Sequence, residues 1–408
     1  MTILGVDERA NALCKAHKPA HFDLEKIVRP NILALQPYHT VRDDYKVDVL
    51  LDANENSYGP MLGTPSELAD RMELHRYPGP GLMGTRDAIT RLRGLPDTAF
   101  TFLGVGSDEV IDLLFRCFAR PAHDKVLICP PTYPMYKVSA AVNDVGLVSV
   151  PLVLDGASFA VDVPAVLEAL KDPAIKIVFL CSPGNPTGSL LSRESIKAVL
   201  DCPHYNGLVV VDEAYIDFPL EEQAMGLKHV GQPVSTIDLV GEYANLVVSQ
   251  TLSKSFGLAG VRLGVAFAQP PTVQIMNNTK APYSISAPSA YFAAQALSSE
   301  GVARMHECTR ALIHNRRQLL ADLGTVPNLG RVLGGNDANF VLVEVLEGGK
   351  PSSERAGAVY HTMAQEHGLM VRNRSAELGC EGCLRISVGT PEENAKAIAL
   401  LRTLLQGA

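Results

Sequence analysis

The sequence predicts an α/β fold with a large, mostly parallel sheet flanked by helices and a smaller α/β domain. Three observations support this prediction: short apolar runs alternate with helical patterns in the middle of the chain, polar or Gly/Pro-rich turns end each run, and a similar pattern returns after a long helix. Runs that are apolar on both faces are typical of parallel strands covered on both sides. The 408 residues suffice for two or three domains.

The predicted elements follow from the apolar runs and the residues that end them. A helical pattern covers about Ser289–Leu323, where Gly324 and Pro327 end it, and an amphipathic helix covers about Ser353–His367. The runs of strand length are Lys125–Cys129, Lys176–Cys181, Leu208–Val211, Asn245–Ser249, Asn339–Val345 and Leu384–Val388. We therefore expect an N-terminal arm with part of the small domain over 1–62, a large domain over 63–292 and a small domain over 293–408.

Composition excludes several classes of protein. Hydrophobic residues make up 47% and charged residues 20%, which is usual for a soluble globular chain. The formal net charge of −8 provides no basic field for nucleic acid, and no apolar run approaches the ~18–20 residues of a membrane-spanning helix. Cys380 and Cys383 form a lone CxxC among eight scattered cysteines, so we expect no metal site and reduced thiols in a cytoplasmic protein.

The first segment with chemical potential is Gly104-Val-Gly-Ser-Asp-Glu109, which apolar residues follow at helical spacing. Ser107 is a plausible N-cap, and Asp108 and Glu109 suit the positive end of a helix dipole. Free amides at such an end can hold a phosphate. The segment lacks the last glycine of a dinucleotide fingerprint and has no clear strand before it, so an ordinary capped helix is the alternative.

Two further segments directly follow predicted strands. In Ser182-Pro-Gly-Asn-Pro-Thr-Gly188, Asn185 could donate its amide to an oxygen, although such a turn needs no function. Asp212 ends a buried strand in Leu208-Val-Val-Val-Asp-Glu-Ala-Tyr215, where a carboxylate is costly without a cation, a metal or a protonated nitrogen. The pair Asp212-Glu213 also resembles that of a nucleotide hydrolase, but the chain contains no GxxxxGK[ST] loop.

The fourth segment is Ser249-Gln-Thr-Leu-Ser-Lys-Ser-Phe-Gly-Leu-Ala-Gly-Val-Arg-Leu-Gly264. A lone lysine is usually a solvated surface charge. Lys254 differs because small hydroxyl residues and glycines surround it, with Arg262 eight positions on. Hydroxyls and an arginine suit a phosphate, and a lysine beside them can attack an aldehyde.

Together these segments fit pyridoxal phosphate. This cofactor needs a lysine for its aldehyde, a carboxylate for its ring nitrogen, donors for its phosphate and phenolic oxygen, and a flat group over its ring. Lys254 would meet the aldehyde, Asp212 the ring nitrogen, and Tyr133, in Pro130-Pro-Thr-Tyr-Pro-Met-Tyr136, the ring face. The candidates for the phenolic oxygen are Asn185 and Tyr215, and those for the phosphate lie at Ser107, Asp108, Glu109, Thr251, Ser253 and Arg262.

The set SPGNPTG, VVVDEAY and TLSKSFGLAGVRLG resembles the pattern of fold-type I aminotransferases. Other segments are similar to the histidinol-phosphate aminotransferase family, of the kind found in fungi. The resemblance runs from about residue 23 to about 403, and Ser57 departs from it because relatives often have proline there. The supporting segments are Leu35–Tyr38, Leu51–Asn56, His75–Pro78, Pro130–Tyr136, Val371–Arg372 and Gly382–Gly389.

The resemblance implies transamination between L-histidinol phosphate and 2-oxoglutarate in histidine biosynthesis, with Lys254 as the catalytic residue. It also implies a homodimer with shared active sites, in which Tyr77 reaches the partner's cofactor phosphate and Tyr38 the substrate phosphate in the partner's site. Arg372 and Arg385 match residues that hold the substrate phosphate, which agrees with the forked pairing of arginine and phosphate. Arg385 would also take the α-carboxylate of glutamate.

Asn54 lies in a segment that the resemblance implies in recognition of the imidazole.

Alternative functions remain open at this point. Another enzyme of the same fold is possible, such as an aromatic amino acid aminotransferase or a threonine-phosphate decarboxylase. So is a non-catalytic binding protein that retains the fold. A dinucleotide-dependent oxidoreductase built on the segment 104–109 is a weaker alternative. Arg372 could instead form a surface ion pair, and Tyr38 and Tyr77 could be packing aromatics.

Overall fold

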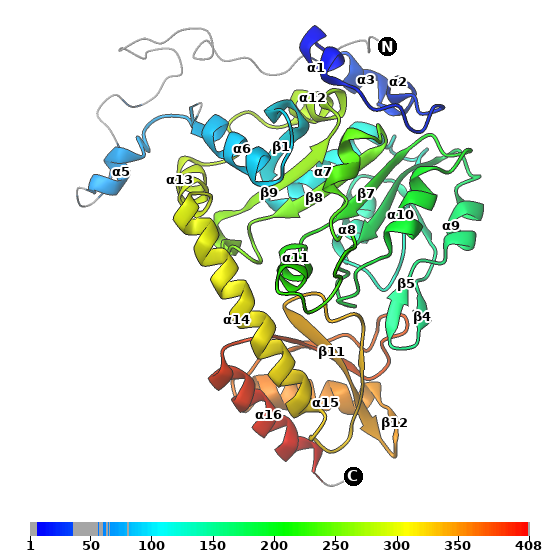
Figure 1. Ribbon diagram of the computed structural model, residues 1–408, viewed down its shortest axis with the longest axis vertical. Helices are drawn as coiled ribbons and strands as arrows, with labels where there is room; N and C mark the ends of the chain where they lie inside the picture. Colours follow the sequence, from blue (N-terminus) through cyan, green and yellow to red (C-terminus); the bar gives the residue numbers. More distant parts are fainter. Residues whose placement is uncertain are drawn as a thin grey trace. The chain divides into compact units, whose positions relative to one another are not determined.

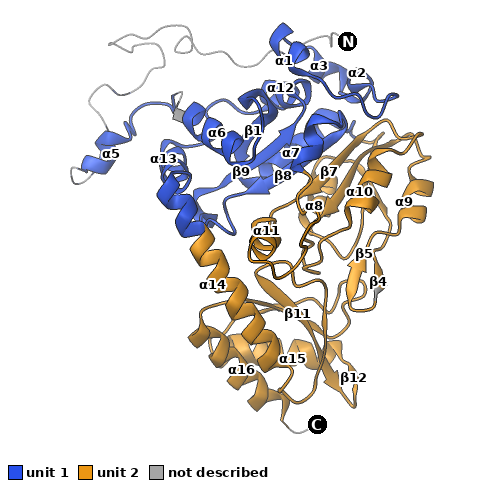
Figure 2. Ribbon diagram, viewed as in Figure 1, with its two compact units in different colours: residues 1–121, 237–305 blue, residues 122–236, 306–408 orange. Residues whose placement is uncertain are grey.

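The computed structural model describes residues 6–35, 56, 60–62, 64, 66–79 and 81–406. The chain divides into two compact units, residues 1–121 with 237–305 and residues 122–236 with 306–408 (Figure 2). These units cut across the domains expected from the sequence, and the predicted boundaries at 62 and 292 stay a prediction. The site residues expected at Tyr38 and Asn54, and the departure at Ser57, lie outside the described residues.

The first unit is built on three antiparallel strands in the order β1-β9-β8. These are β1 (Thr101–Val105), β9 (Leu263–Ala268) and β8 (Leu246–Thr251), and every residue of β8 and β9 is buried. Helices α7 (Gly106–Phe118) and α12 (Pro270–Thr279) pack against β1 and β9 (Figure 1). β8 confirms the predicted strand at 245–249, whereas β1 and β9 were not predicted.

The segment expected to be an N-terminal arm contains short helices that are tied to the first unit. Buried Leu24 and Ile27 anchor one of them, and the N–H of Arg29 donates to the carbonyl of Cys117 at 2.9 Å. Besides α7 and α12, the described part of this unit contains α1 (Glu8–Leu13), α2 (Leu24–Ile27), α3 (Pro30–Leu33), α5 (Glu67–Arg71), α6 (Gly81–Leu92) and α13 (Ala287–Ala296), with short 3-10 turns at Thr98–Phe100, Ile237–Gly241 and Ala259–Val261.

The second unit contains four parallel strands in the order β7-β6-β2-β3. They confirm three predicted strands to within two residues, and β7 is buried along its whole length, which explains its unbroken apolar run. The strands are β2 (Lys125–Ile128), β3 (Gly146–Ser149), β6 (Ile175–Cys181) and β7 (Leu208–Asp212), and a hairpin is formed by β4 (Val153–Asp155) and β5 (Ser158–Ala160). The neighbouring helices are α8 (Met135–Val142), α9 (Val163–Ala169), α10 (Arg193–Leu200) and α11 (Asp217–Ala224).

A smaller antiparallel sheet in the same unit confirms the two predicted C-terminal strands. Its order is β10-β11-β14-β13, with β12 at the edge of β11. The strands are β10 (Leu329–Leu333), β11 (Phe340–Glu347), β12 (Lys350–Pro351), β13 (Arg372–Asn373) and β14 (Cys383–Ser387). Helices α15 (Ser353–Gln365) and α16 (Pro391–Leu405) lie beside it (Figure 1).

The two faces of this small sheet have different neighbours. Val341, Val343 and Leu384 pack in a core with residues of α15 and α16. Leu342 and Cys383 belong to a separate cluster with Phe159 and Leu333. Because side chains alternate along a strand, Arg385 leaves β14 on the face of Cys383, away from α15 and α16.

The long helical pattern near residue 300 is two helices, not one. α13 ends at Ala296, and α14 (Ser299–Leu323) begins after Ser298, whose hydroxyl accepts the N–H of Gly301 at 3.1 Å. Serine is a favoured N-cap, so the break has a local signal that the periodicity obscured. Among the described residues, no helix is both long enough and apolar enough to cross a membrane.

We predict that Arg316→Met lowers the free energy of unfolding by ~3–5 kcal/mol, because it leaves a buried carboxylate without its cation. Arg316 on α14 is buried; it pairs with Glu222 at 2.5 Å and donates to the carbonyl of Ala338 at 2.6 Å. The matched control is Lys171→Met, which breaks an ion pair with Glu168 whose side chains are 60% and 70% exposed, and should cost below ~1 kcal/mol. Urea unfolding followed by circular dichroism measures both; equal losses would contradict the assignment.

Candidate active site

The turn from β1 into α7 forms one part of the site, in the first unit. α7 begins at Gly106, with Val105 as N-cap and no side chain capping it. The prediction of Ser107 as N-cap is therefore wrong, as is the expectation of no strand before this segment. The reason is the backbone: Gly106 has φ +72, so the chain turns directly from strand to helix. Glu109 accepts the N–H of Val105 at 2.5 Å instead.

Two glycines let the segment that carries Arg262 lie directly against this helix start. A Cβ on Gly264 would lie 2.3 Å from the N of Ser107, and a Cβ on Gly106 would lie 2.3 Å from Nη2 of Arg262. The N–H of Gly106 donates to the carbonyl of Arg262 at 3.0 Å. Arg262 Nη2 then pairs with Asp108 Oδ2 at 3.1 Å. The structure thus brings a guanidinium to the amide end of α7, where an anion is favoured.

The predicted lysine lies in a tight turn just after β8. The N–H of Ser253 donates to the hydroxyl of Thr251 at 3.1 Å, and the two hydroxyls are 2.9 Å apart. The hydroxyl of Thr251 also donates to the carbonyl of Leu263, the residue after Arg262, at 3.1 Å. The N–H of Gly257 closes the turn on the carbonyl of Lys254 at 3.0 Å. Hydroxyls, a guanidinium and helix amides in one unit are a donor set that suits phosphate.

Tyr77 lies on the segment between α5 and α6 in the same unit. Its ring stacks on that of Tyr283, with centroids 4.7 Å apart and planes at 25°. Half of the Tyr77 side chain is exposed, so it is available at the surface of this chain. Its expected contact with a partner's cofactor stays a prediction.

In the second unit, Asp212 ends β7 with only 3% of its surface exposed. The hydroxyl of Tyr136 donates to its Oδ2 at 2.6 Å, and the N–H of Ala214 donates to its Oδ1 at 3.2 Å. Burial, together with the Asp212 charge, raises the pKa of Tyr136 well above its usual value. The phenol of Tyr136 therefore stays protonated in the neutral range and donates to Asp212.

The sequence did not single out Tyr136, although it follows the predicted Tyr133 by three residues. The ring of Tyr136 stacks on Phe179 of β6, with centroids 4.5 Å apart and planes at 14°. The ring of Tyr133 meets it edge-on at 5.7 Å. Tyr136 therefore fixes both Asp212 and the aromatic residue expected to lie over a ring.

Asn185 and Arg385 meet in the second unit although 200 positions separate them. Nη1 of Arg385 donates to Oδ1 of buried Asn185, which makes the Asn185 amide nitrogen its donor for a ligand. The guanidinium also lies 5.1 Å above the ring of Phe340, a cation–π contact. Tyr215 meets that ring edge-on at 5.2 Å, and burial raises the pKa of its phenol. The ring of Phe340 thus packs against both Arg385 and Tyr215, a role that was not predicted from the sequence.

Positive charge gathers around Arg385. Arg372 lies directly opposite it in the pairing of β13 and β14. Arg374, two residues after Arg372, pairs with Glu377 at 2.7 Å. Arg374 was not predicted as a site residue from the sequence. Burial lowers the pKa of the Arg385 guanidinium, and the charges of Arg374 and Arg372 lower it further. Such a cluster is stabilised by an anion.

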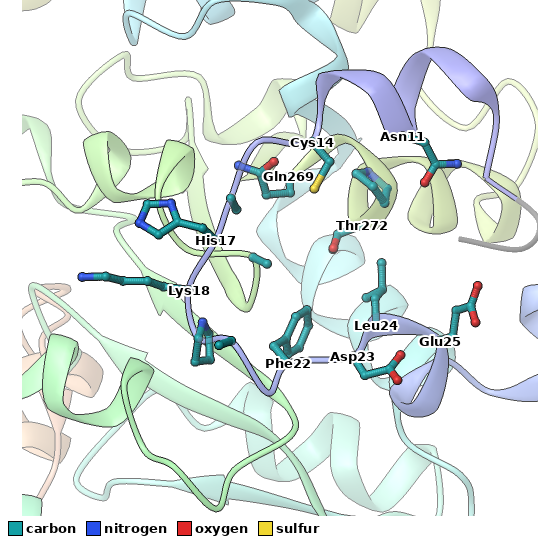
Figure 3. A pocket seen from close by; sticks show the side chains of 15 residues that line it. Asn11, Cys14, His17, Lys18, Phe22, Asp23, Leu24, Glu25, Gln269 and Thr272 are labelled. Atoms are coloured by element: carbon teal, nitrogen blue, oxygen red, sulfur yellow. The ribbon is translucent and has the colours of Figure 1, made fainter. Parts of the chain in front are cut away.

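A separate cavity in the first unit contains none of the expected site residues. The N-terminal segment lines it with Asn11, Cys14, Lys18 and Phe22, and Gln269 and Thr272 at the start of α12 also line it (Figure 3). Burial raises the pKa of the Cys14 thiol, which makes it a poor nucleophile. Among the residues described, no three His, Cys, Asp or Glu side chains gather in a way that could hold a metal ion.

Comparison with known proteins agrees with this chemistry. The family described as "Aminotransferase class I and II" matches residues 46–401. The histidinol-phosphate aminotransferase of Schizosaccharomyces pombe is 46% identical, over 94% of this chain and 98% of that protein, and its namesake in Saccharomyces cerevisiae is 42% identical over the same shares. This chain belongs to the histidinol-phosphate aminotransferases, within the class I and II family.

Solved structures extend the agreement to the fold. The histidinol-phosphate aminotransferase of Sinorhizobium meliloti, solved in complex with pyridoxal-5'-phosphate, has a TM-score of 0.69. The match covers 87% of this chain and 89% of that one at 24% identity, which supports the fold alone. The fold-type I class expected from the sequence is confirmed.

We predict that Tyr136→Phe lowers the free energy of unfolding by ~1–3 kcal/mol at pH 8, because the Asp212 carboxylate loses a buried donor. Denaturant unfolding of the cofactor-free protein measures this loss. The matched control is Tyr360→Phe on α15, a half-buried tyrosine, which should change the free energy by less than ~0.5 kcal/mol.

The pH dependence of that difference checks the same assignment. The fold favours the neutral phenol of Tyr136 and raises its pKa, so its contribution is complete below the unfolded value of about 10 and is lost at higher pH. The gap between the wild type and Tyr136→Phe should therefore shrink above pH ~10, by roughly 1.4 kcal/mol per pH unit. A gap that stays constant to pH 11 would contradict a buried neutral phenol at this position.

Proposed function

We propose that this protein is a pyridoxal 5'-phosphate-dependent transaminase that exchanges an amino group between L-histidinol phosphate and 2-oxoglutarate in histidine biosynthesis. The observation that carries the proposal is the placement of Arg372 opposite Arg385, beside Asn185, in a chain of this family. Histidinol phosphate has a phosphate and no carboxylate, and arginines pair with phosphate in forked geometry.

The residues present fit the cofactor. Asp212 is a buried carboxylate that would pair with the ring nitrogen, and Asn185 and Tyr215 would donate to the phenolic oxygen. The phosphate would take its donors from the start of α7, around Ser107, Asp108 and Glu109, and from Thr251, Ser253 and Arg262. Tyr133 would cover the ring and Lys254 would bond the aldehyde carbon. When bound, the cofactor supplies an aldehyde that captures the amino group and a cationic ring that accepts electrons.

Asp212 and Lys254 each handle one proton in the proposed reaction. The charge-assisted hydrogen bond from the ring nitrogen to Asp212 is worth ~1.5–3 kcal/mol, and each ~1.4 kcal/mol raises the pKa of that nitrogen by about one unit. With the cofactor bound and an amino substrate in place, the freed amine of Lys254 would be the base that removes the proton from the substrate carbon bearing the amino group, and the acid that returns it on the far side of the nitrogen. It therefore acts as both base and acid.

The arginines serve both substrates in turn. Arg372 and Arg385 would hold the phosphate of histidinol phosphate, and Arg385 would take the α-carboxylate of glutamate. Asn185 accepts from Arg385 and so orients its guanidinium. Because the two substrates use the same groups, one must leave before the other binds, which gives ping-pong kinetics.

We further propose a cytoplasmic homodimer with shared active sites. Large apolar side chains are exposed on the segment before α6, at Met61 (72% exposed) and Leu62, and within α6 at Met83, and such surface is usually covered by a partner. Tyr77 follows this segment and would reach the partner's cofactor phosphate, while Tyr38 and Asn54 would contribute to the substrate pocket. The eight free cysteines agree with a reducing compartment.

We predict that the purified protein with its cofactor uses histidinol phosphate ~10–100-fold more efficiently in kcat/KM than phenylalanine, because an unmade arginine–phosphate pair costs ~1.5–3 kcal/mol. A glutamate-coupled transamination assay measures this, with O-phosphothreonine as a second comparison. Lys254→Ala is the inactive control and should also lose the visible absorbance of the bound cofactor.

Preference for phenylalanine would contradict the proposal and favour an aromatic aminotransferase. Release of carbon dioxide from O-phosphothreonine would favour a decarboxylase of the same fold. Double-reciprocal plots of rate against histidinol phosphate, at several 2-oxoglutarate concentrations, should be parallel lines. Intersecting lines would contradict a pocket that the two substrates share.

A further inference from the structure

Arg374 lies beside the two arginines that the proposed function uses. β13 and β14 pair with Arg372 opposite Arg385, and the N–H of Arg374 continues the pairing by donating to the carbonyl of Cys383 at 2.8 Å. Side chains alternate between the faces of a strand. Val371 packs in the helix-covered core, so Arg372 and Arg374 both leave the strand on the opposite face, which is also the face of Arg385.

The guanidiniums of Arg374 and Arg385 both retain donors. Nη1 of Arg374 pairs with Oε1 of Glu377 at 2.7 Å, with the two side chains 16% and 21% exposed. Nε of Arg374 is buried and has no hydrogen-bond partner within the described parts of the chain, and the same holds for Nε of Arg385. A buried N–H without a hydrogen bond is costly, so binding an acceptor next to these two Nε atoms would be favoured.

The charges of this cluster match a phosphate ester better than a carboxylate. Three guanidiniums, on Arg372, Arg374 and Arg385, and one carboxylate, on Glu377, sum to +3 − 1 = +2. A phosphate monoester carries ~−1.5 to −2 near neutral pH, whereas a carboxylate carries one negative charge. Burial raises the pKa of the Glu377 carboxyl and the charge of Arg374 opposes that rise, so loss of water at this place disfavours the charged form of Glu377.

We propose that Arg374 is a third arginine of the substrate anion site and that Glu377 is its internal counter-ion, which the substrate phosphate displaces. This inference rests on the proposed function and adds a specificity determinant to it. Without phosphate, Glu377 holds Arg374 in place. When a phosphate ester binds, its oxygens take the donors of Arg374, and a substrate that has only a carboxylate leaves the Arg374–Glu377 pair closed.

A purely structural role is the competing explanation. Arg374 and Glu377 are three residues apart, and the N–H of Glu377 donates to the carbonyl of Arg374 at 2.9 Å, so their side chains could simply close a turn. A structural role would affect both substrates alike. A role in phosphate recognition would affect the phosphorylated substrate selectively.

The kinetic test compares Arg374→Gln with the wild-type holoenzyme. We expect KM for histidinol phosphate to rise ~10–100-fold and KM for glutamate to rise less than ~3-fold. Arg374→Lys keeps the positive charge but cannot form two parallel hydrogen bonds to phosphate. Its KM for histidinol phosphate should lie between the values of the wild type and Arg374→Gln, and its side-chain volume changes little. Equal increases for both substrates, or no increase for either, would overturn the inference.

A binding measurement tests the same residues without turnover. Inorganic phosphate titrated into the holoenzyme by calorimetry should bind ~10-fold or more weakly to Arg374→Gln and ~3–10-fold more tightly to Glu377→Gln, which lacks the competing charge. Unchanged phosphate affinity in both variants would overturn the inference. If the wild type fails to turn over histidinol phosphate, the proposed function fails separately, and the titration still decides whether Arg374 binds phosphate.

Discussion

One carboxylate that folding removes from water sets the requirements for the second unit. Asp212 lies at the end of β7, a strand whose every residue is buried, and an ion in that position needs donors or a cation. The chain supplies the phenol of Tyr136, itself fixed by stacking on Phe179 of the adjacent strand. A neutral phenol donates a hydrogen bond to the carboxylate without neutralising its charge, so this end of the sheet carries a buried negative charge that suits a cationic cofactor.

In the first unit, close backbone packing is the constraint that places the proposed phosphate-binding residues. Gly106 and Gly264 have no side chains where β9 meets the start of α7, and this absence lets Arg262 lie over the helix amides. The turn that carries Lys254 is hydrogen bonded to the same strand through Thr251. Main-chain contacts thus fix the backbone that carries the proposed phosphate donors and Lys254 before any ligand binds.

Much of this could be predicted from the sequence, because burial on both faces leaves a strong local signal. The apolar runs at β6 and β7 and the polar residue that ends β7 identified both the parallel strands and Asp212. The start of α7 could not be predicted from capping rules, because the positive φ of Gly106 replaces a capping side chain. Tyr136, Phe340 and Arg374 were missed because their roles depend on contacts between distant segments. The contact between Asn185 and Arg385 could not be predicted for the same reason, because 200 positions separate the two residues.

The central claim is that Asp212 keeps the ring nitrogen of the cofactor protonated. Solid-state NMR of the holoenzyme, loaded with pyridoxal phosphate that carries ¹⁵N in the ring, reports that proton directly. The account predicts a protonated nitrogen in the wild type between pH 6 and pH 9, and an unprotonated one in Asp212→Asn at the same pH. An unprotonated nitrogen in the wild type, or a spectrum that Asp212→Asn leaves unchanged, would contradict it.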